Sequence, residues 1–123
     1  MSVAVSYFEI PVADLNRAQQ FYETVFAIEL EPAVVDGYEM ALFPVVESGP
    51  GASGALAKGD VYKPGKRGPV LYFTAVSIDT VLTRLARLDG LVLFAKKRVE
   101  GQGFVAEIED NEGNRIGLFE PQT

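Results

Sequence analysis

The residue types present in this chain set narrow limits on its chemistry. Its 123 residues include no histidine and no cysteine. Ser-His-Asp and Cys-His catalysis are therefore excluded, and so are zinc sites of the usual His/Cys type. Any acid–base chemistry falls to Asp, Glu, Lys, Tyr or a chain terminus. These two absences remove most hydrolase mechanisms.

Two stretches match functional motifs by spacing, but their context favours a purely structural role. The segment from Gly49 to Gly54 has the letters of the dinucleotide-binding pattern GxGxxG. No helix is expected after it and Pro50 lies inside it, so it does not predict a cofactor site. The segment from Asp110 to Asn114 is acidic enough to suggest calcium. It lacks the full loop and the closing Glu of an EF-hand, and a tight turn between strands explains it better.

Charge and hydropathy limit the partners. The net charge of −6 argues against nucleic acid, whose phosphates require a basic surface. The longest apolar runs, at 40–43 and 91–95, are far shorter than the roughly 20 residues that span a bilayer. The first residues show no export signal. Because cysteine is absent, we expect no disulfide and a cytoplasmic protein.

The elements expected in the first half follow from hydrophobic periodicity. Residues 7–12 predict a strand, and Asp14 is a good N-cap for the helix that follows. The apolar face of this helix is formed by Leu15, Ala18, Tyr22, Val25 and Phe26. Residues 28–32, 38–44 and 53–58 predict three further strands separated by turn residues.

The second half repeats this order after a connector over 59–69 that is rich in Gly, Pro and basic residues. Residues 70–76 predict a strand, and Ser77 can cap a second helix that ends at Gly90 in the C′ position. Residues 91–95, 104–109 and 115–119 predict three more strands. The caps Asp14 and Ser77 are separated by the same offset as Gly54 and Gly117.

We therefore predict one α+β domain over residues 1–123, made of two tandem βαβββ units at about 5–60 and 68–120. Each helix would cover one face of its own sheet. The other face would then curl against its twin, so that eight strands form an incurled sheet around a cavity.

Several of these segments resemble the glyoxalase/bleomycin-resistance/dioxygenase superfamily, also called the vicinal oxygen chelate (VOC) superfamily. Residues 8–18, followed by Phe21-Tyr22 and Val25-Phe26, are similar to its opening signature. Residues 53–56, 70–73 and 112–118 resemble a lactoylglutathione-lyase-related subgroup. The resemblance extends from about residue 7 to 119 and implies a glyoxalase-like fold. It leaves the activity open, because the superfamily includes isomerases, dioxygenases, epimerases, thiol transferases and antibiotic-sequestering proteins.

Metal-dependent members of this superfamily take four ligands from the first and last strands of each half. By position, the resemblance places them at Tyr7, Gly54, Val70 and Gly117. Two of these residues have no side chain, one is aliphatic, and a single phenolate would hold a metal weakly. We therefore predict no metal at the family site and no cofactor, so that the usual metal-stabilised enediolate chemistry is not expected.

Strand alternation then predicts which residues face the cavity, because side chains of equal parity share one face. The two glycines would widen the wall where a carboxylate would otherwise stand, and Pro11, Ala52 and Leu56 share the same parity. The predicted ligand-binding residues are Tyr7, Glu9, Gly54, Val70, Tyr72, Thr74, Arg115, Gly117 and Phe119.

Glu9 is the candidate catalytic residue, since a carboxylate on an apolar wall can serve as a general base. Alternatively, Glu9 pairs with Arg115 or a lysine, or accepts backbone hydrogen bonds, and only orders the site. Tyr7 and Tyr72 are either donors to a ligand oxygen or packing residues with satisfied hydroxyls. Arg115 either binds a ligand carboxylate or is simply exposed.

Three functions remain open at this point. The favoured one is a metal-free, bleomycin-resistance-like protein that binds a small organic ligand between its two sheets, as drug-sequestering relatives do. The alternatives are a metal-independent isomerase or lyase that uses Glu9 as base, and a regulatory or interaction domain with a vestigial cavity. The expected partners are a small molecule and, because family members commonly pair, a second copy of the chain in a homodimer.

Overall fold

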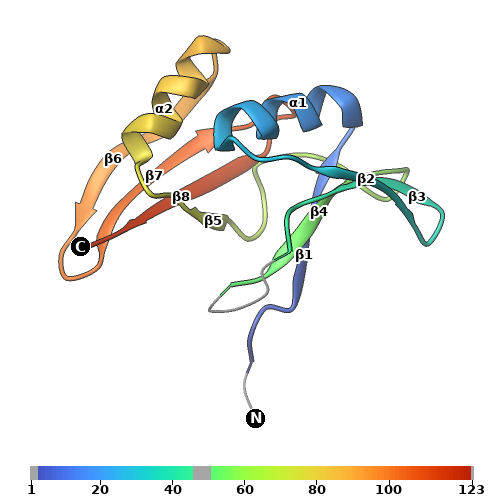
Figure 1. Cartoon of the computed structure of the whole chain (residues 1–123), viewed down its shortest axis with the longest axis horizontal. Helices are drawn as coiled ribbons and strands as arrows, with labels where there is room; N and C mark the ends of the chain where they lie inside the picture. The colour runs from blue at the N-terminus through green and yellow to red at the C-terminus, as the bar shows by residue number, and fades with distance from the viewer. Residues whose placement is uncertain (1–2, 46–50, 123) are drawn as a thin grey trace.

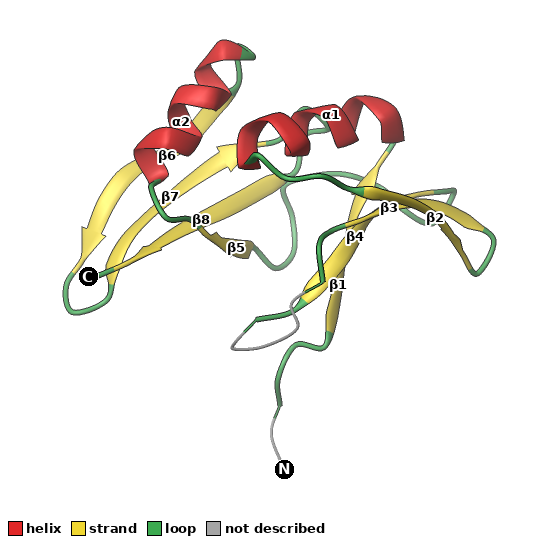
Figure 2. Ribbon diagram, viewed as in Figure 1, coloured by secondary structure: helices red, strands yellow, loops and turns green. Residues whose placement is uncertain are grey.

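A computed structural model describes residues 3–45 and 51–122, and its elements follow the order βαβββ twice (Figures 1 and 2). The first half contains β1 (Tyr7–Val12), α1 (Leu15–Phe26), β2 (Glu31–Val35), β3 (Tyr38–Leu42) and β4 (Ser53–Lys58). The second half contains β5 (Leu71–Thr74), α2 (Ile78–Arg87), β6 (Leu91–Val99), β7 (Gly103–Glu109) and β8 (Arg115–Pro121). This order confirms the predicted α+β fold of two βαβββ units. Gly49 and Pro50 of the GxGxxG-like stretch lie outside the described residues.

The eight strands form two four-stranded sheets with the orders β1-β4-β3-β2 and β5-β8-β7-β6. In each sheet the first strand of the unit runs parallel to the last, and the other neighbours are antiparallel. The two sheets have the same topology, as expected for tandem units. They are not joined into the single incurled eight-stranded sheet that we predicted, and they do not close around a cavity.

The two helices begin at the predicted residues because both have a side-chain N-cap. The Asp14 carboxylate accepts a hydrogen bond from the N–H of Arg17 at 3.1 Å, and the Ser77 hydroxyl accepts one from the N–H of Thr80 at 3.2 Å. These bonds satisfy N–H groups that have no partner within the first helical turn. Both predicted caps are confirmed.

The end of α2 differs from the prediction by one residue. Asp89, with φ of 55°, takes the left-handed conformation that we had assigned to Gly90. Aspartate tolerates this conformation better than most residues. Gly90 follows it and donates its N–H to the Leu85 carbonyl oxygen at 3.1 Å. A side chain at Gly90 would meet the side chain of Leu85, so Gly90 serves close packing there and not the turn.

The two halves share one hydrophobic core, which includes buried residues of both helices and both sheets. In Figure 1 both helices lie on the same side of the sheets, and β1 and β5 are the edge strands that approach each other. The Phe73 ring of β5 lies 5.6 Å from the Phe8 ring and 5.3 Å from the Phe26 ring, measured between centroids. The Tyr22 ring stacks on Phe26 at 5.8 Å. These aromatic contacts hold the two halves in a fixed relation.

Within the described residues, neither helix has the length and apolar composition needed to cross a membrane.

Candidate functional site

The side chains of β1 alternate between the two faces of its sheet. Ile10 and Val12 are buried in the shared core, whereas Tyr7 and Glu9 are exposed on the opposite face. On the second sheet Tyr72 pairs with Gly117 in register. Partners in a parallel pair point to the same side of the sheet, so these two residues share the face that points away from α2.

Three further predicted residues belong to β5, to β8 or to the segment just before β5. Thr74 pairs with Phe119 in register, and Thr74 is exposed. Val70 precedes β5, which begins at Leu71. Thr74, Phe119 and Val70 do not line the cavity where β1 meets the second sheet.

Gly54 lies on the opposite face from the one we predicted. The register pairs Phe8 of β1 with Gly54 of β4, and Ile10 with Leu56. Gly54 and Leu56 therefore lie on the face of the sheet that points into the core. A Cβ atom on Gly54 would lie 2.6 Å from the Phe8 ring and would also collide with the Phe8 carbonyl oxygen. The alternate residues Ala55 and Ala57 occupy the Glu9 face instead. Gly54 and Gly117 are therefore not equivalent, although they fit the same offset in the sequence.

Neither glycine leaves open space for a ligand. A Cβ atom on Gly117 would lie 2.5 Å from the Tyr72 ring, so the ring occupies the volume of the missing side chain. The Phe8 ring fills the corresponding volume at Gly54. We had expected the glycines to widen the cavity wall, and that expectation is wrong because a neighbouring aromatic ring covers each of them.

The residues at the four family ligand positions do not fit a metal ion. Gly54 and Gly117 offer no donor atom and are covered by rings, Val70 is aliphatic, and the Tyr7 hydroxyl donates to Glu9. Within residues 3–45 and 51–122, no three His, Cys, Asp or Glu side chains gather closely enough to hold a metal. No reaction step through a metal can be built on this donor set.

Glu9 forms the centre of a hydrogen-bonded cluster with two tyrosines. Its Oε2 accepts a hydrogen bond of 3.0 Å from Tyr7, and its Oε1 accepts one of 2.7 Å from Tyr62. The hydrogen bond to Glu9 is the main cause that raises the pKa of Tyr62 to about 12. Burial and the same carboxylate raise the pKa of Tyr7. Both phenols therefore stay protonated and act as donors, and Glu9 is exposed and does not stand on an apolar wall.

Tyr62 comes from the connector between the halves and was not among the residues we predicted. Together with Tyr38 it packs against a small cluster of Met40, Ala55 and Ala57. The Tyr38 and Tyr62 rings meet edge to face with their centroids 5.3 Å apart. This part of the predicted cavity is therefore filled by the protein's own side chains. The connector carried no periodic pattern that would have revealed the contact.

A second cluster lies on the outer face of the second sheet around Glu107, which is only 7% exposed. Arg115 binds both carboxylate oxygens of Glu107, with Nη2 at 3.1 Å, and Tyr72 donates to it at 2.7 Å. The hydrogen bonds from Arg115, and then the one from Tyr72, lower the pKa of Glu107 although burial opposes them. Sequence reasoning missed Glu107, even though an acidic residue between the apolar Ala106 and Ile108 was a usable signal.

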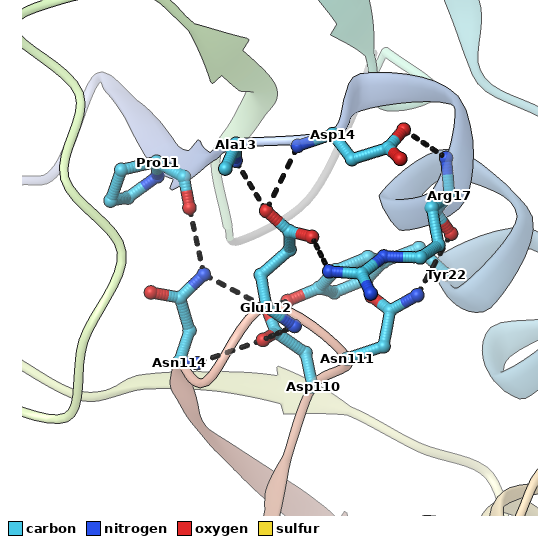
Figure 3. Close-up of polar contacts among 9 residues, drawn as sticks. All are labelled: Pro11, Ala13, Asp14, Arg17, Tyr22, Asp110, Asn111, Glu112 and Asn114. Atoms are coloured by element: carbon cyan, nitrogen blue, oxygen red, sulfur yellow. Dashed lines mark hydrogen bonds and ion pairs between the residues drawn. The ribbon is translucent and has the colours of Figure 1, made fainter.

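The turn from Asp110 to Asn114 anchors β8 to the start of α1, as Figure 3 shows. Glu112 accepts hydrogen bonds from the backbone N–H groups of Ala13 and Asp14 and binds Arg17. Asp110 accepts one from the buried Tyr22 hydroxyl at 2.6 Å. Both acidic side chains are thus engaged with the protein itself, and the prediction of a tight turn is confirmed by the bond from Gly113 N–H to the Asp110 carbonyl oxygen.

The candidate site is a cavity of about 600 Å³ where β1 meets the second sheet, which we call the junction cavity. Its apolar wall includes Phe8, Ile10, Leu71 and Ile116, and the connector from Lys63 to Arg67 forms its rim. Two of the predicted site residues, Glu9 and Arg115, line it. A second cavity of about 490 Å³ lies between α1 and the end of α2. It contains none of the predicted site residues, so the junction cavity is the better candidate.

Asn114 fixes the shape of the junction cavity by joining three segments. Its amide nitrogen donates to the Pro11 carbonyl oxygen of β1 at 2.8 Å, and its amide oxygen accepts from the connector N–H of Gly65 at 2.9 Å. Lys66 forms an ion pair with Glu109 at 3.0 Å. The rim of the cavity is thereby held to both sheets.

Comparison with known proteins gives one family match and several similar folds. Residues 5–45 match the family described as bleomycin resistance protein-like N-terminal. No curated protein sequence matches the chain. A glyoxylase/bleomycin resistance protein/dioxygenase domain from Frankia sp. EAN1pec has a similar structure, with a TM-score of 0.75, 17% identity, and coverage of 99% of this chain and 100% of that one.

Two further solved structures are similar over nearly the whole chain. TnmS3, an antibiotic binding protein from Streptomyces sp. CB03234, has a TM-score of 0.71 and 24% identity, with 99% of both chains covered. The fosfomycin resistance protein FosX from Listeria monocytogenes has a TM-score of 0.70 and 19% identity, with 99% of this chain and 96% of that one covered. At this identity the likeness concerns the fold. The N-terminal match and the shared fold agree with the predicted resemblance to the glyoxalase/bleomycin-resistance (VOC) superfamily.

Proposed function

We propose that this protein binds a small organic ligand in the junction cavity and that it does so without a metal ion. The observation that carries the proposal is the cavity itself, which combines about 600 Å³ of space with an apolar wall and the charged side chains of Glu9 and Arg115. Small-molecule sites usually have this composition of apolar walls with a few polar groups. The poor fit of the family ligand positions to a metal supports the metal-free part of the proposal.

The description of one similar structure, TnmS3, agrees with this class of function. TnmS3 is described as an antibiotic binding protein and FosX as a fosfomycin resistance protein. Only the description of TnmS3 names binding, and neither description names catalysis. We therefore propose binding as the function.

In this proposal Glu9 orders the site and does not act as a base. Both of its carboxylate oxygens already accept hydrogen bonds from Tyr7 and Tyr62. The bond to Tyr62 ties the connector to β1, and the connector forms the rim of the cavity. Glu9 would thus act on the ligand through the position of the rim.

A thermal-shift screen against a library of small organic molecules, performed after EDTA treatment, tests the proposal. A ligand at 100 times its Kd adds about 2.7 kcal/mol to the free energy of unfolding. We expect saturable increases in Tm from a few related compounds, and no change in any compound over time. A Tm increase that appears only when Zn²⁺, Ni²⁺, Mn²⁺ or Fe²⁺ is added would contradict metal-free binding.

We also propose that the chain forms a homodimer through the edge of the second sheet. The edge strand β6 exposes Leu91, Val92 and Phe94, with Phe94 59% exposed. Exposed apolar edge strands are surfaces that proteins usually cover. Light scattering should give twice the monomer mass for the native chain and the monomer mass for Phe94→Asp. The control Val34→Asp, on the edge strand β2 of the other sheet, should leave the dimer intact, and a native monomer would contradict the proposal.

A further inference from the structure

The charges around the junction cavity have the opposite sign to the charge of the whole chain. The chain carries a net charge of −6, yet the cavity is lined by Lys63, Lys66, Arg67 and Arg115 against the single carboxylate of Glu9. Three of the four cations belong to the short connector that forms the rim. Basic side chains are thus concentrated at this cavity although the protein as a whole is acidic. Charged residues placed at random would follow the overall charge, so this cluster points to a role in binding at the cavity.

Two of these cations are neutralised by acidic neighbours, and two are not. Lys66 pairs with Glu109, and Arg115 pairs with Glu107. Lys63 and Arg67 form no ion pair with any residue in the described part of the chain. They therefore leave an uncompensated positive charge at the rim.

The carboxylate of Glu9 offsets this charge only in part. Its two oxygens already accept hydrogen bonds from phenols, which spread its negative charge. No ion pair between Glu9 and Lys63 or Arg67 is formed among the described residues. The rim thus attracts an anionic group, and guanidinium and ammonium groups are the usual partners of carboxylate and phosphate oxygens.

The opposite wall of the cavity is apolar, formed by Phe8, Ile10, Leu71 and Ile116. A ligand that satisfies both walls needs an apolar body and an anionic oxygen group at one end. We infer that the ligand of the junction cavity is an organic anion, with its carboxylate, phosphate or phosphonate held by Lys63 and Arg67 and its apolar body against β1 and β8. This inference rests on the proposed function and specifies the class of ligand.

A matched pair of probes separates charge from shape. Cinnamate and its neutral amide, cinnamamide, have the same apolar body and differ only in the anionic group. Titrations of the full chain, followed by amide chemical shifts, give the affinity of each probe and the residues that it contacts. The double variant Lys63→Ala/Arg67→Ala removes the two free cations, and Lys97→Ala/Arg98→Ala removes the same residue types from β6 as a control.

We expect cinnamate to bind about tenfold more tightly than cinnamamide, with shifts at Phe8, Ile10, Leu71 and Ile116. The preference should disappear in the Lys63/Arg67 variant, persist in the Lys97/Arg98 control, and weaken as salt is added. Equal binding of both probes at these residues would overturn the inference of an anionic ligand and leave the proposed function intact. Perturbation of no cavity residue by cinnamate would also overturn the inference, whereas the absence of any hit in the library screen would overturn the proposed function.

Discussion

Tyr62 in the connector donates a 2.7 Å hydrogen bond to Glu9 in β1, across 53 residues of sequence. This bond joins the rim of the junction cavity to one of its walls. It also engages Glu9, the predicted catalytic residue, in a hydrogen bond within the protein. The shape of the cavity therefore depends on a contact between a strand and a segment without regular structure.

The Tyr62–Glu9 bond can be followed through the titration of the phenol. The pKa of Tyr62 is raised from 10.0 to about 12, chiefly by the hydrogen bond to Glu9. The hydrogen bond that raises this pKa stabilises the fold fully below pH 10. Its contribution is lost as the pH rises through 12. We expect Glu9→Gln to return the Tyr62 transition toward 10, and to flatten the loss of stability over this pH range.

The measurement is tyrosinate absorbance against pH, with Tyr62→Phe to identify the transition of Tyr62. The control Asp60→Asn removes the negative charge of the group that accepts from the Tyr38 hydroxyl and should leave the Tyr62 transition in place. If Glu9→Gln left the transition near 12, the hydrogen bond would not be its cause.

The two covered glycines should be intolerant of a side chain, in contrast to a glycine in open space. Gly54→Ala forces the Phe8 ring and backbone to move, and overpacking of this kind costs about 1–3 kcal/mol. Gly65→Ala is the matched control, because nothing lies within 4 Å of its Cβ position and its φ is not in the left-handed region. Urea unfolding measures the stability of both variants. Equal stabilities would show that the packing of the Phe8 ring does not require a glycine at position 54.

The buried bond between Tyr22 and Asp110 should contribute measurably to stability. Tyr22→Phe removes a 2.6 Å hydrogen bond to Asp110, a residue that is only 3% exposed. The carboxylate oxygen that loses this bond keeps a single donor, the Asn114 amide. The loss of a partner from a buried charged group costs about 1–3 kcal/mol. Tyr38→Phe, which removes an exposed bond of 3.3 Å to Asp60, is the control. A Tyr22→Phe variant as stable as that control would contradict this assignment.

The Arg115–Glu107 pair should make stability depend on pH in the acid range. Because Arg115 and Tyr72 lower the pKa of Glu107 below its usual 4.5, the pair stabilises the fold above pH 4.5 and loses its effect as the pH falls through the lowered value. We expect Arg115→Ala to reduce Tm at neutral pH by roughly 5 °C and to flatten the decrease of Tm in acid.

Arg98→Ala, on the exposed surface of β6, is the control for this variant. It removes the same charge without touching Glu107, and its Tm should follow the native curve at every pH. An Arg115→Ala variant with the native acid profile would show that Glu107 is stabilised by other groups.

The parts of the fold that depend on local sequence could be predicted, whereas the parts that depend on register could not. The caps at Asp14 and Ser77 are set by residues three positions apart, so the sequence alone reveals them. The face of Gly54 depends on how β4 pairs with β1, and a shift of one residue reverses the face of every side chain. Our assignment of Gly54 carried such a shift, since it followed the superfamily position and not the register of Phe8 with Gly54.

The candidate site could be predicted only in part for a related reason. Glu9 and Arg115 lie on regular strands, where alternation assigns each side chain to one face of its sheet. Tyr62, Lys63 and Arg67 belong to a connector without periodicity, so nothing in the sequence placed them beside β1 and β8. The placement in a lactoylglutathione-lyase-related subgroup likewise stays a prediction, because the identities with the similar structures are too low to test it.

The most direct test of metal-free ligand binding at the junction cavity is an amide chemical-shift titration of the EDTA-treated protein with the best compound of the library screen. We predict saturable shifts that cluster at Phe8, Ile10, Leu71 and Ile116 and leave Gln20 and Thr24, in the cavity between the helices, unchanged. Shifts confined to that second cavity, or binding that requires an added metal ion, would contradict the proposal.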